Sequence, residues 1–369
     1  MSDARARPLA GLDLKVLHVT DAEVTAPYRD RIAHLTVQPK LQSFVTRMLA
    51  KHKIAEGAVV MMEPSTGKIL AYASRAKDGR DINVDSFAPS ASVFKIVTGS
   101  TLVQVAGLTP DYKSCYFGGE QRITERELKE DPKRDVYCAT LGQAMGRSIN
   151  SVFARLASKK LAPDDLRSIA SQFGYGESIP FDVPIETSKL EIPTDTLGFA
   201  RTAAGFWNTS LSPIHGALLA ATIANGGNMP RPWVVQSVTI GANSVYRAPA
   251  PSMFRAKVVA SSTASSVAKM MLETVSQGTS YKAFHDRKGH AFLPDIAVAG
   301  KTGTLNQTSP TKLFTWFVGF APADNPQVAI AVLVVNDPVW EVKANVLARK
   351  ALMAFFHLHG DDDVAMPDE

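Results

Sequence analysis

The hydrophobic positions near the start of the chain follow two different periods. Apolar residues recur at helical spacing at Leu41, Phe44, Val45, Met48 and Leu49. Two apolar runs follow at 57–63 and 68–73, and the turn-forming sequence Pro64-Ser65-Thr66-Gly67 separates them, which is typical of a β-hairpin. Residues 1–34 combine proline and charge with few periodic apolar positions. We therefore expect an N-terminal arm over 1–34, then a helix and a hairpin.

The middle of the chain has a mainly helical pattern. Residues 92–173 are helix-like with polar loops around 113–135, and loops rich in proline and glycine follow over 174–196. A long apolar helix is predicted over 213–225, closed by Gly226-Gly227. A strand-like segment follows near 233–240.

The last third predicts a helix near 264–275, strands over 296–304, 314–320 and 328–335, and a final helix near 342–356. Strands at both ends with helices between them indicate an α/β (α+β) fold. We expect an antiparallel sheet flanked by helices, with an inserted, largely helical subdomain. The domain would span 35–360, with its sheet part at 35–91 and 262–360 and its helical insert at 92–261. Residues 361–369 would be a disordered acidic tail.

Composition and charge argue against several classes of function. The chain has 369 residues, 45% of them hydrophobic and 20% charged, and its net charge of +5 is spread without a dense basic block, which argues against a nucleic-acid partner. Its apolar runs, such as 329–335, are far shorter than the ~20 residues of a membrane-spanning helix, and no secretory signal is recognisable. The eight histidines show no metal-ligand spacing, so we expect neither metal nor cofactor.

The two cysteines, Cys115 and Cys138, belong to no metal-binding motif. They would form one disulfide if the protein works outside the cytoplasm, or remain two thiols if it does not. The sequence leaves both alternatives open.

A serine and a lysine three residues apart on a helix share one face, so the amine can reach the hydroxyl. This Ser-x-x-Lys pattern occurs five times, starting at Ser65, Ser74, Ser92, Ser266 and Ser309. Only the copy at Ser92 and Lys95 follows a proline-containing loop and opens a strongly apolar helix. Burying these two polar groups costs free energy unless they form hydrogen bonds or take part in a reaction. Ser92 is therefore the candidate nucleophile.

Two further motifs accompany this pair. Ser148-Ile149-Asn150 is the only Ser-x-Asn of the chain and precedes a predicted helix. Lys301-Thr302-Gly303-Thr304 contains the only Lys-Thr-Gly and lies on a predicted buried strand, where Gly303 would let a ligand backbone approach closely.

The three motifs together resemble the set shared by penicillin-binding proteins and class A β-lactamases. Their order, with 56 positions from Ser92 to Ser148 and 151 from Asn150 to Lys301, is similar to that of transpeptidase domains of penicillin-binding proteins. The resemblance covers about 35–357. Stretches at 35–42, 66–71, 173–176 and 224–227 look like the monofunctional, class B members.

The resemblance implies a serine D,D-transpeptidase, or a D,D-carboxypeptidase, that acts on peptidoglycan stem peptides through an acyl-enzyme on Ser92. Lys95 would take the proton of Ser92, Ser148 would relay a proton to the leaving amine, and Asn150 would hold the substrate amide. The implied catalytic residues are Ser92, Lys95, Ser148, Asn150 and Lys301. The implied substrate-binding residues are Thr302, Gly303 and Thr304, and the backbone N–H groups of Ser92 and Thr304 would form the oxyanion hole.

Partners and location follow from the same resemblance. β-Lactam antibiotics would be covalent inhibitors, and cell-envelope assembly proteins are further expected partners. The location would be the periplasm or cell envelope, with membrane anchoring through a segment absent from this chain.

The sequence also departs from the family pattern. The family usually has Pro-Gly-Ser ahead of the lysine, whereas Pro89-Ser90-Ala91-Ser92 adds a residue and lacks the glycine. One alternative is a serine β-lactamase, although no Glu-x-x-Leu-Asn segment follows the Ser-x-Asn motif. The other is a non-catalytic protein of the envelope that binds β-lactams or muropeptides, or acts as a scaffold.

Overall fold

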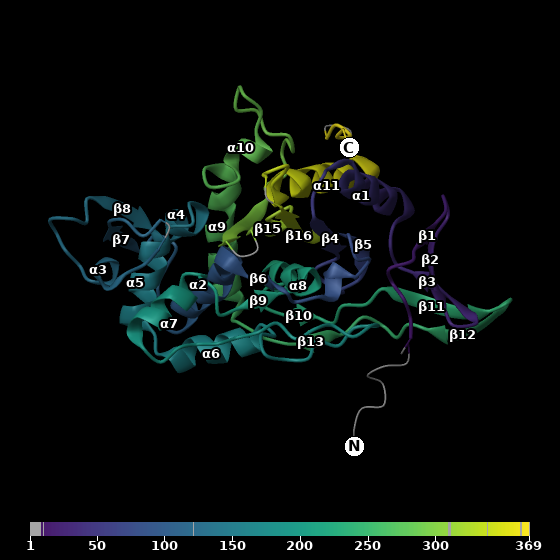
Figure 1. Ribbon diagram of the computed structural model, residues 1–369, viewed down its shortest axis with the longest axis horizontal. Helices are drawn as coiled ribbons and strands as arrows, with labels where there is room; N and C mark the ends of the chain where they lie inside the picture. Colours follow the sequence, from purple (N-terminus) through teal and green to yellow (C-terminus); the bar gives the residue numbers. More distant parts are fainter. Residues whose placement is uncertain are drawn as a thin grey trace, which may run out of the picture.

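The main sheet of the protein is antiparallel and draws its strands from both ends of the chain (Figure 1). The computed structural model describes residues 9, 11–120, 122–308, 311–337, 339–361 and 364–368. The strand order is β14-β15-β16-β4-β5. The bounds are β4 (Glu56–Met62), β5 (Ile69–Ala76), β14 (Ala299–Thr308), β15 (Thr311–Ala321) and β16 (Val328–Asn336). The predicted antiparallel sheet is thus confirmed.

Helices cover both faces of this sheet. α1 (Pro39–Lys51) and α11 (Ala344–Leu358) pack on one face, and α8 (Pro213–Ala224) packs on the other (Figure 1). All nine residues of β16 are buried, because a central strand covered on both faces needs a continuous apolar run.

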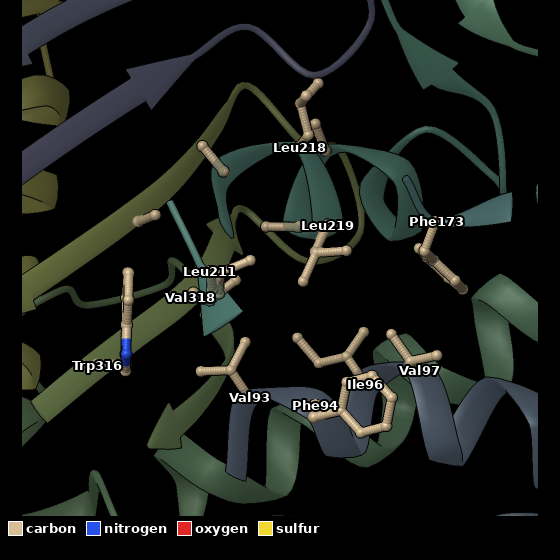
Figure 2. Close-up of a cluster of buried hydrophobic side chains, with 14 of the residues drawn as sticks. Val93, Phe94, Ile96, Val97, Phe173, Leu211, Leu218, Leu219, Trp316 and Val318 are labelled. Carbon is tan, nitrogen blue, oxygen red and sulfur yellow. The ribbon is translucent and has the colours of Figure 1, made fainter. Parts of the chain in front are cut away.

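The apolar core between the sheet and the helical part is built around α8. Eleven of its twelve residues are buried, as expected of a helix that is apolar all round. Figure 2 shows side chains from η2 (Ala91–Phe94), α2 (Lys95–Gln104), α8, β9 (Ser210–Leu211) and β15 converging, with Val93, Ile96 and Leu219 among them. This core holds the start of α2 firmly against the sheet.

The region at the left of Figure 1 is largely helical, as predicted. It contains α3 (Glu125–Leu128), α4 (Leu141–Gly146), α5 (Asn150–Lys160), α6 (Pro163–Gln172) and α7 (Thr196–Ala203). It also contains a hairpin that the sequence did not predict, formed by β7 (Lys113–Tyr116) and β8 (Tyr137–Thr140) and closed by a Cys115–Cys138 disulfide. We call residues 113–120 and 122–140 the hairpin lobe.

A second sheet corrects the expected N-terminal arm. Its order is β1-β2-β3-β11-β12, with bounds β1 (His18–Val19), β2 (Val24–Tyr28), β3 (Arg31–Leu35), β11 (Val235–Ile240) and β12 (Asn243–Arg247). Strands β1 to β3 were missed because they are short and β3 pairs with β11, two hundred residues away. β11 itself lies where the sequence predicted a strand, near 233–240. Residues 1–8 and 10 of the expected arm lie outside the described residues.

The remaining elements connect these parts. They are β6 (Ala88–Pro89), β10 (Met229–Pro230), β13 (Met253–Arg255), α9 (Ser261–Ser276), α10 (Tyr281–Phe284) and the 3-10 turns η1 (Ile82–Val84) and η2 (Ala91–Phe94). The predicted helical insert therefore also contains short strands. Where one domain ends and the next begins stays a prediction.

The C-terminal tail is another correction. Val364 is fully buried, and its carbonyl oxygen lies 3.0 Å from His357 Nδ1, so this part of the expected disordered tail packs on the core. An apolar residue among the acidic ones makes this possible. Residues 362, 363 and 369 lie outside the described residues. Within the described part of the chain, no helix combines the length and the apolar character needed to cross a membrane.

Candidate active site

Ser92 lies in the turn η2, which leads directly into α2. The loop before it is held from both sides, because β6 pairs with β9 and the indole N–H of Trp316 donates to the Pro89 carbonyl oxygen at 2.9 Å. Ala91 has a φ of +50°, in the left-handed region that favours glycine. Ala91 therefore adopts the backbone conformation that a glycine would adopt at lower cost.

Two glycines make room for this turn. A Cβ on Gly205 would lie 2.4 Å from the Ala91 carbonyl oxygen, and a Cβ on Gly303 would lie 3.2 Å from the Ala91 Cβ. The close approach of β14 to Ser92 therefore depends on Gly303 having no side chain.

Lys95 follows Ser92 by one helical turn, and its Nζ lies 2.8 Å from Ser92 Oγ. The same Nζ lies 2.7 Å from Asn150 Oδ1 and 2.5 Å from the Ala204 carbonyl oxygen. Lys95 is completely buried. Burial, and then the nearby Lys301 cation, hold the pKa of Lys95 well below its ordinary value.

The three partners of Lys95 orient its amine. The oxygens of Asn150 and Ala204 can only accept hydrogen bonds, whereas the Ser92 hydroxyl can donate one. A neutral amine has two N–H groups and one lone pair. In the neutral form of Lys95, the two N–H groups would therefore point at Asn150 and Ala204, and the lone pair would face the hydroxyl of Ser92.

Ser148 and Asn150 come from the junction of α4 and α5. Ser148 has a φ of +57°, and Asn150 is the first residue of α5. Asn150 Nδ2 donates to the Glu120 carbonyl oxygen at 2.9 Å. Its Oδ1 is thereby directed at Lys95.

Lys301 lies in β14 and is completely buried, and burial lowers its pKa to about 7. Its Nζ donates to Ser148 Oγ at 3.0 Å and to the Thr302 carbonyl oxygen at 2.9 Å. Thr302 and Thr304 of the same strand line a cavity next to Ser92. There Thr302 Oγ1 lies 2.6 Å from Thr279 Oγ1.

These groups surround a cavity of about 370 Å³. Ser92, Ser148 and Asn150 line one side of it, and Thr302, Gly303 and Thr304 line another. Further lining residues that the sequence did not predict are Glu120, Thr279, Thr315, Trp316, Lys343, Ala344 and Asn345. The cavity therefore offers a serine hydroxyl and a hydroxyl-rich wall to one ligand, and the buried amine of Lys95 lies directly behind that serine.

The structure brings together all the residues that the sequence analysis selected. Hydrogen bonds link Lys95 to Ser92 and to Asn150, and another links Lys301 to Ser148. Residues 302–304 line the same cavity as Ser92. The sequence analysis missed Ala204 and Glu120 because neither belongs to a motif. Ala204 contacts Lys95 through its backbone carbonyl oxygen, and Glu120 lies in a polar loop. The polar positions at the start of the final helix, such as Asn345, were the one feature of the sequence that could have indicated further residues of the cavity wall.

A group of three histidine, cysteine, aspartate or glutamate side chains suited to a metal ion does not occur among the residues that the structure describes. The functional groups at the cavity are mainly hydroxyls and amides, together with the Lys343 amine, the Trp316 indole and the carboxylate of Glu120. This donor set suits acyl transfer by a serine rather than metal coordination.

Comparison with known proteins identifies the family of the chain. The family model described as penicillin binding protein transpeptidase domain matches residues 57–354. Peptidoglycan D,D-transpeptidase PbpA of Mycobacterium tuberculosis is 28% identical over 318 residues, covering 76% of this chain and 62% of that protein. The chain thus spans less than two thirds of the length of this relative.

Solved structures show the same architecture. The crystal structure of the D,D-transpeptidase domain of a peptidoglycan glycosyltransferase from Eggerthella lenta has a TM-score of 0.71 and 26% identity, covering 89% of this chain and 83% of that one. The penicillin G acyl-enzyme complex of penicillin-binding protein A from M. tuberculosis has a TM-score of 0.66 and 25% identity, covering 89% and 80%. With the family model matching most of its length, this chain belongs to the penicillin-binding protein transpeptidase domain family.

Proposed function

We propose that the protein is a serine-type D,D-transpeptidase that acts on peptidoglycan stem peptides through an acyl-enzyme on Ser92. The observation that carries the proposal is the orientation of the buried Lys95 amine, 2.8 Å from Ser92 Oγ with its other two contacts both acceptors. This arrangement activates one hydroxyl at the wall of a cavity. The shared fold and the name of the M. tuberculosis relative support the reaction class.

The acylation step follows from this geometry. Ser92 Oγ attacks the carbonyl carbon of the peptide bond between two D-residues, and its proton passes to Lys95 Nζ. The backbone N–H groups of Ser92 and Thr304, residues that border the same cavity, are the proposed donors to the oxyanion. The leaving amine receives its proton through Ser148, whose hydroxyl contacts Lys301. Water or an amine acceptor then releases the acyl group.

Lys301, Thr302 and Thr304 are the proposed anchor for the substrate carboxylate. With a pKa of about 7, Lys301 is about half charged at neutral pH, and a bound carboxylate would favour the charged form. Asn150 has a second N–H on Nδ2, besides the one directed at Glu120, with which it can hold the substrate amide. No cofactor takes part in this scheme.

The same chemistry predicts covalent inhibition by β-lactams, and the penicillin G acyl-enzyme complex of penicillin-binding protein A from M. tuberculosis supports this prediction. A peptidoglycan substrate places the protein in the cell envelope or periplasm. Anchoring by a segment beyond this chain and contacts with envelope assembly proteins belong to the same proposal.

The test uses a donor peptide that ends in two D-amino acids, with and without an amine acceptor. A transpeptidase releases the last residue and forms a new amide with the acceptor, whereas a carboxypeptidase gives only the hydrolysed peptide. Ser92→Ala should abolish both reactions, and Ser266→Ala, in another Ser-x-x-Lys sequence on α9, should leave them unchanged. Rapid hydrolysis of penicillin would instead show a β-lactamase, and an inert wild-type protein a non-catalytic one.

A further inference from the structure

The side-chain amide of Asn150 has two chemically different ends, and only one of them suits the proposed base. Its Oδ1 lies 2.7 Å from Lys95 Nζ, and its Nδ2 donates to the Glu120 carbonyl oxygen at 2.9 Å. Because a carbonyl oxygen can only accept, Glu120 decides which end of the amide faces Lys95.

Glu120 belongs to the hairpin lobe, which presses on the first turn of α5. Gly119 has a φ of +82°, and a Cβ there would lie 2.8 Å from the Ser151 Cβ and 3.2 Å from the Ser151 backbone nitrogen. The lobe therefore has little freedom to slide without moving the Glu120 carbonyl.

Arg155, one and a half turns further along α5, forms hydrogen bonds to this lobe through its buried side chain. Its Nε donates to the Glu127 carbonyl oxygen at 2.9 Å, and its Nη1 donates to the Cys115 carbonyl oxygen at 2.7 Å. The guanidinium also contacts both carboxylate oxygens of Asp135, at 2.7 and 3.0 Å. The side chains of Arg155 and Asp135 are only 2% and 7% exposed. One buried cation thus binds three separate points of the lobe to α5.

We propose that Arg155 is a positioning residue for acylation: it fixes the hairpin lobe on α5, so that the Glu120 carbonyl keeps the oxygen of Asn150 directed at Lys95. The inference rests on the proposed function, because it concerns the rate at which Ser92 is acylated. It assigns a catalytic consequence to a buried ion pair that touches no substrate.

A turned Asn150 would impair the base in two ways. Nδ2 would donate to the lone pair of Lys95 and compete with the Ser92 hydroxyl for it. Loss of the oxygen contact would also disfavour the charged amine and lower the pKa of Lys95 further. Lys301 of β14 is the cation beside Lys95, and Glu120 and Lys343 are the other charged side chains lining the cavity in the described part of the chain.

The experiment measures the second-order rate constant of Ser92 acylation by a fluorescent penicillin as a function of pH. The variant is Arg155→Met combined with Asp135→Asn, which leaves no unpaired buried charge. We expect acylation at least ~10-fold slower, with the alkaline-rising part of the pH profile moved to lower pH. The control Arg255→Met removes a partly buried arginine that contacts Glu177 and the Ser171 carbonyl, away from the lobe, and should change neither quantity.

A double-mutant cycle with Asn150→Ala tests the route of the effect. If Arg155 acts through Asn150, the Arg155/Asp135 change has no further effect on acylation in the Asn150→Ala background. An equal loss in both backgrounds, or a loss of melting temperature with an unchanged acylation rate and pH profile, would overturn the inference.

Asp135→Asn alone serves if the double variant does not fold. It keeps one acceptor oxygen for Arg155, and we expect an intermediate rate with the same direction of pH shift. An unchanged rate and profile in this folded variant would also overturn the inference. A wild-type protein that is not acylated on Ser92 would instead refute the proposed function itself.

Discussion

At the scale of single residues, the candidate site contains two buried lysines. Lys95 and Lys301 are both completely buried, and the pKa of each lies below its ordinary value. A lysine needs such an environment to work as a base near neutral pH. The nearby Lys301 cation lowers the pKa of Lys95 in addition to burial.

Replacing the proposed base tests the role of Lys95. Arginine remains charged at all accessible pH values, so Lys95→Arg should slow acylation of Ser92 by about 10²–10⁴-fold. Stopped-flow measurement with a fluorescent penicillin gives the rate. Lys269→Arg, the matched change in the Ser266 sequence on α9, should have no effect. Comparable acylation by Lys95→Arg would exclude Lys95 as the base.

The pKa of Lys301 predicts how stability depends on pH. Its folded-state pKa is about 7, whereas a lysine of the unfolded chain titrates near ~10.4. Between these values the unfolded state binds more protons, so the contribution of Lys301 to the free energy of unfolding becomes more favourable as pH rises. Urea unfolding at pH 7 and 9 should show that the free energy of unfolding of the wild type increases with pH relative to that of Lys301→Met. A constant difference would contradict the lowered pKa.

Gly303 is predicted to be intolerant of a side chain. A Cβ there would lie 3.2 Å from Ala91 Cβ, Ser90 O and Trp316 Cβ, none of which is the free end of a flexible side chain. Gly303→Ala should therefore lower stability by about 1–3 kcal/mol and slow acylation by displacing η2 from β14. Gly142→Ala, where the nearest atoms lie 3.4 Å or more away, is the control. Normal labelling and stability of Gly303→Ala would contradict the packing argument.

At the scale of elements, hydrophobic periodicity located the long helices and the central strands well. α1, α8, α9, α11 and β14 to β16 lie where the pattern placed them, with shifted ends, because each buries a wide apolar face. β7 and β8 could not be found in this way. Four of their eight residues are exposed and one is buried, so the hairpin depends on pairing and the disulfide rather than on an apolar pattern.

The disulfide of this hairpin is predicted to stabilise the protein. Cys115 and Cys138 are 23 positions apart, and closing a loop of this size in the unfolded chain contributes roughly 3 kcal/mol in the chain-entropy model. Both residues are exposed, so a dithiol reductant can reach them. The measurement compares urea unfolding of oxidised and reduced protein, with a Cys115→Ser, Cys138→Ser variant as the control that reduction leaves unchanged. Equal stability of both forms would contradict this prediction.

At the scale of the whole molecule, the candidate site joins three distant parts of the chain. Ser92 and Lys95 stand at the start of α2, Ser148 and Asn150 precede or open α5, and Lys301 lies on the edge strand β14. Short motifs identified these residues before their proximity was visible. The Glu120 carbonyl and the Arg155 contacts were not predictable, because they depend on backbone atoms and on how the lobe folds over α5.

The sheet formed by β1, β2, β3, β11 and β12 could not be predicted as a sheet, because it depends on pairing between strands that are far apart in the chain. Pairing between β3 and β11 joins residues near 33 to residues near 238, and nothing local marks such partners. The main sheet was easier because its central strands are long and fully apolar.

The central claim is that Ser92 is the residue that becomes acylated, and peptide mapping by mass spectrometry tests it most directly. The protein is incubated with penicillin G, digested, and each peptide is examined for the added penicilloyl mass. We predict one adduct per chain, on the peptide that contains Ser92, and none in Ser92→Ala. An adduct on any other serine, or an adduct that persists in Ser92→Ala, would contradict the assignment of the nucleophile.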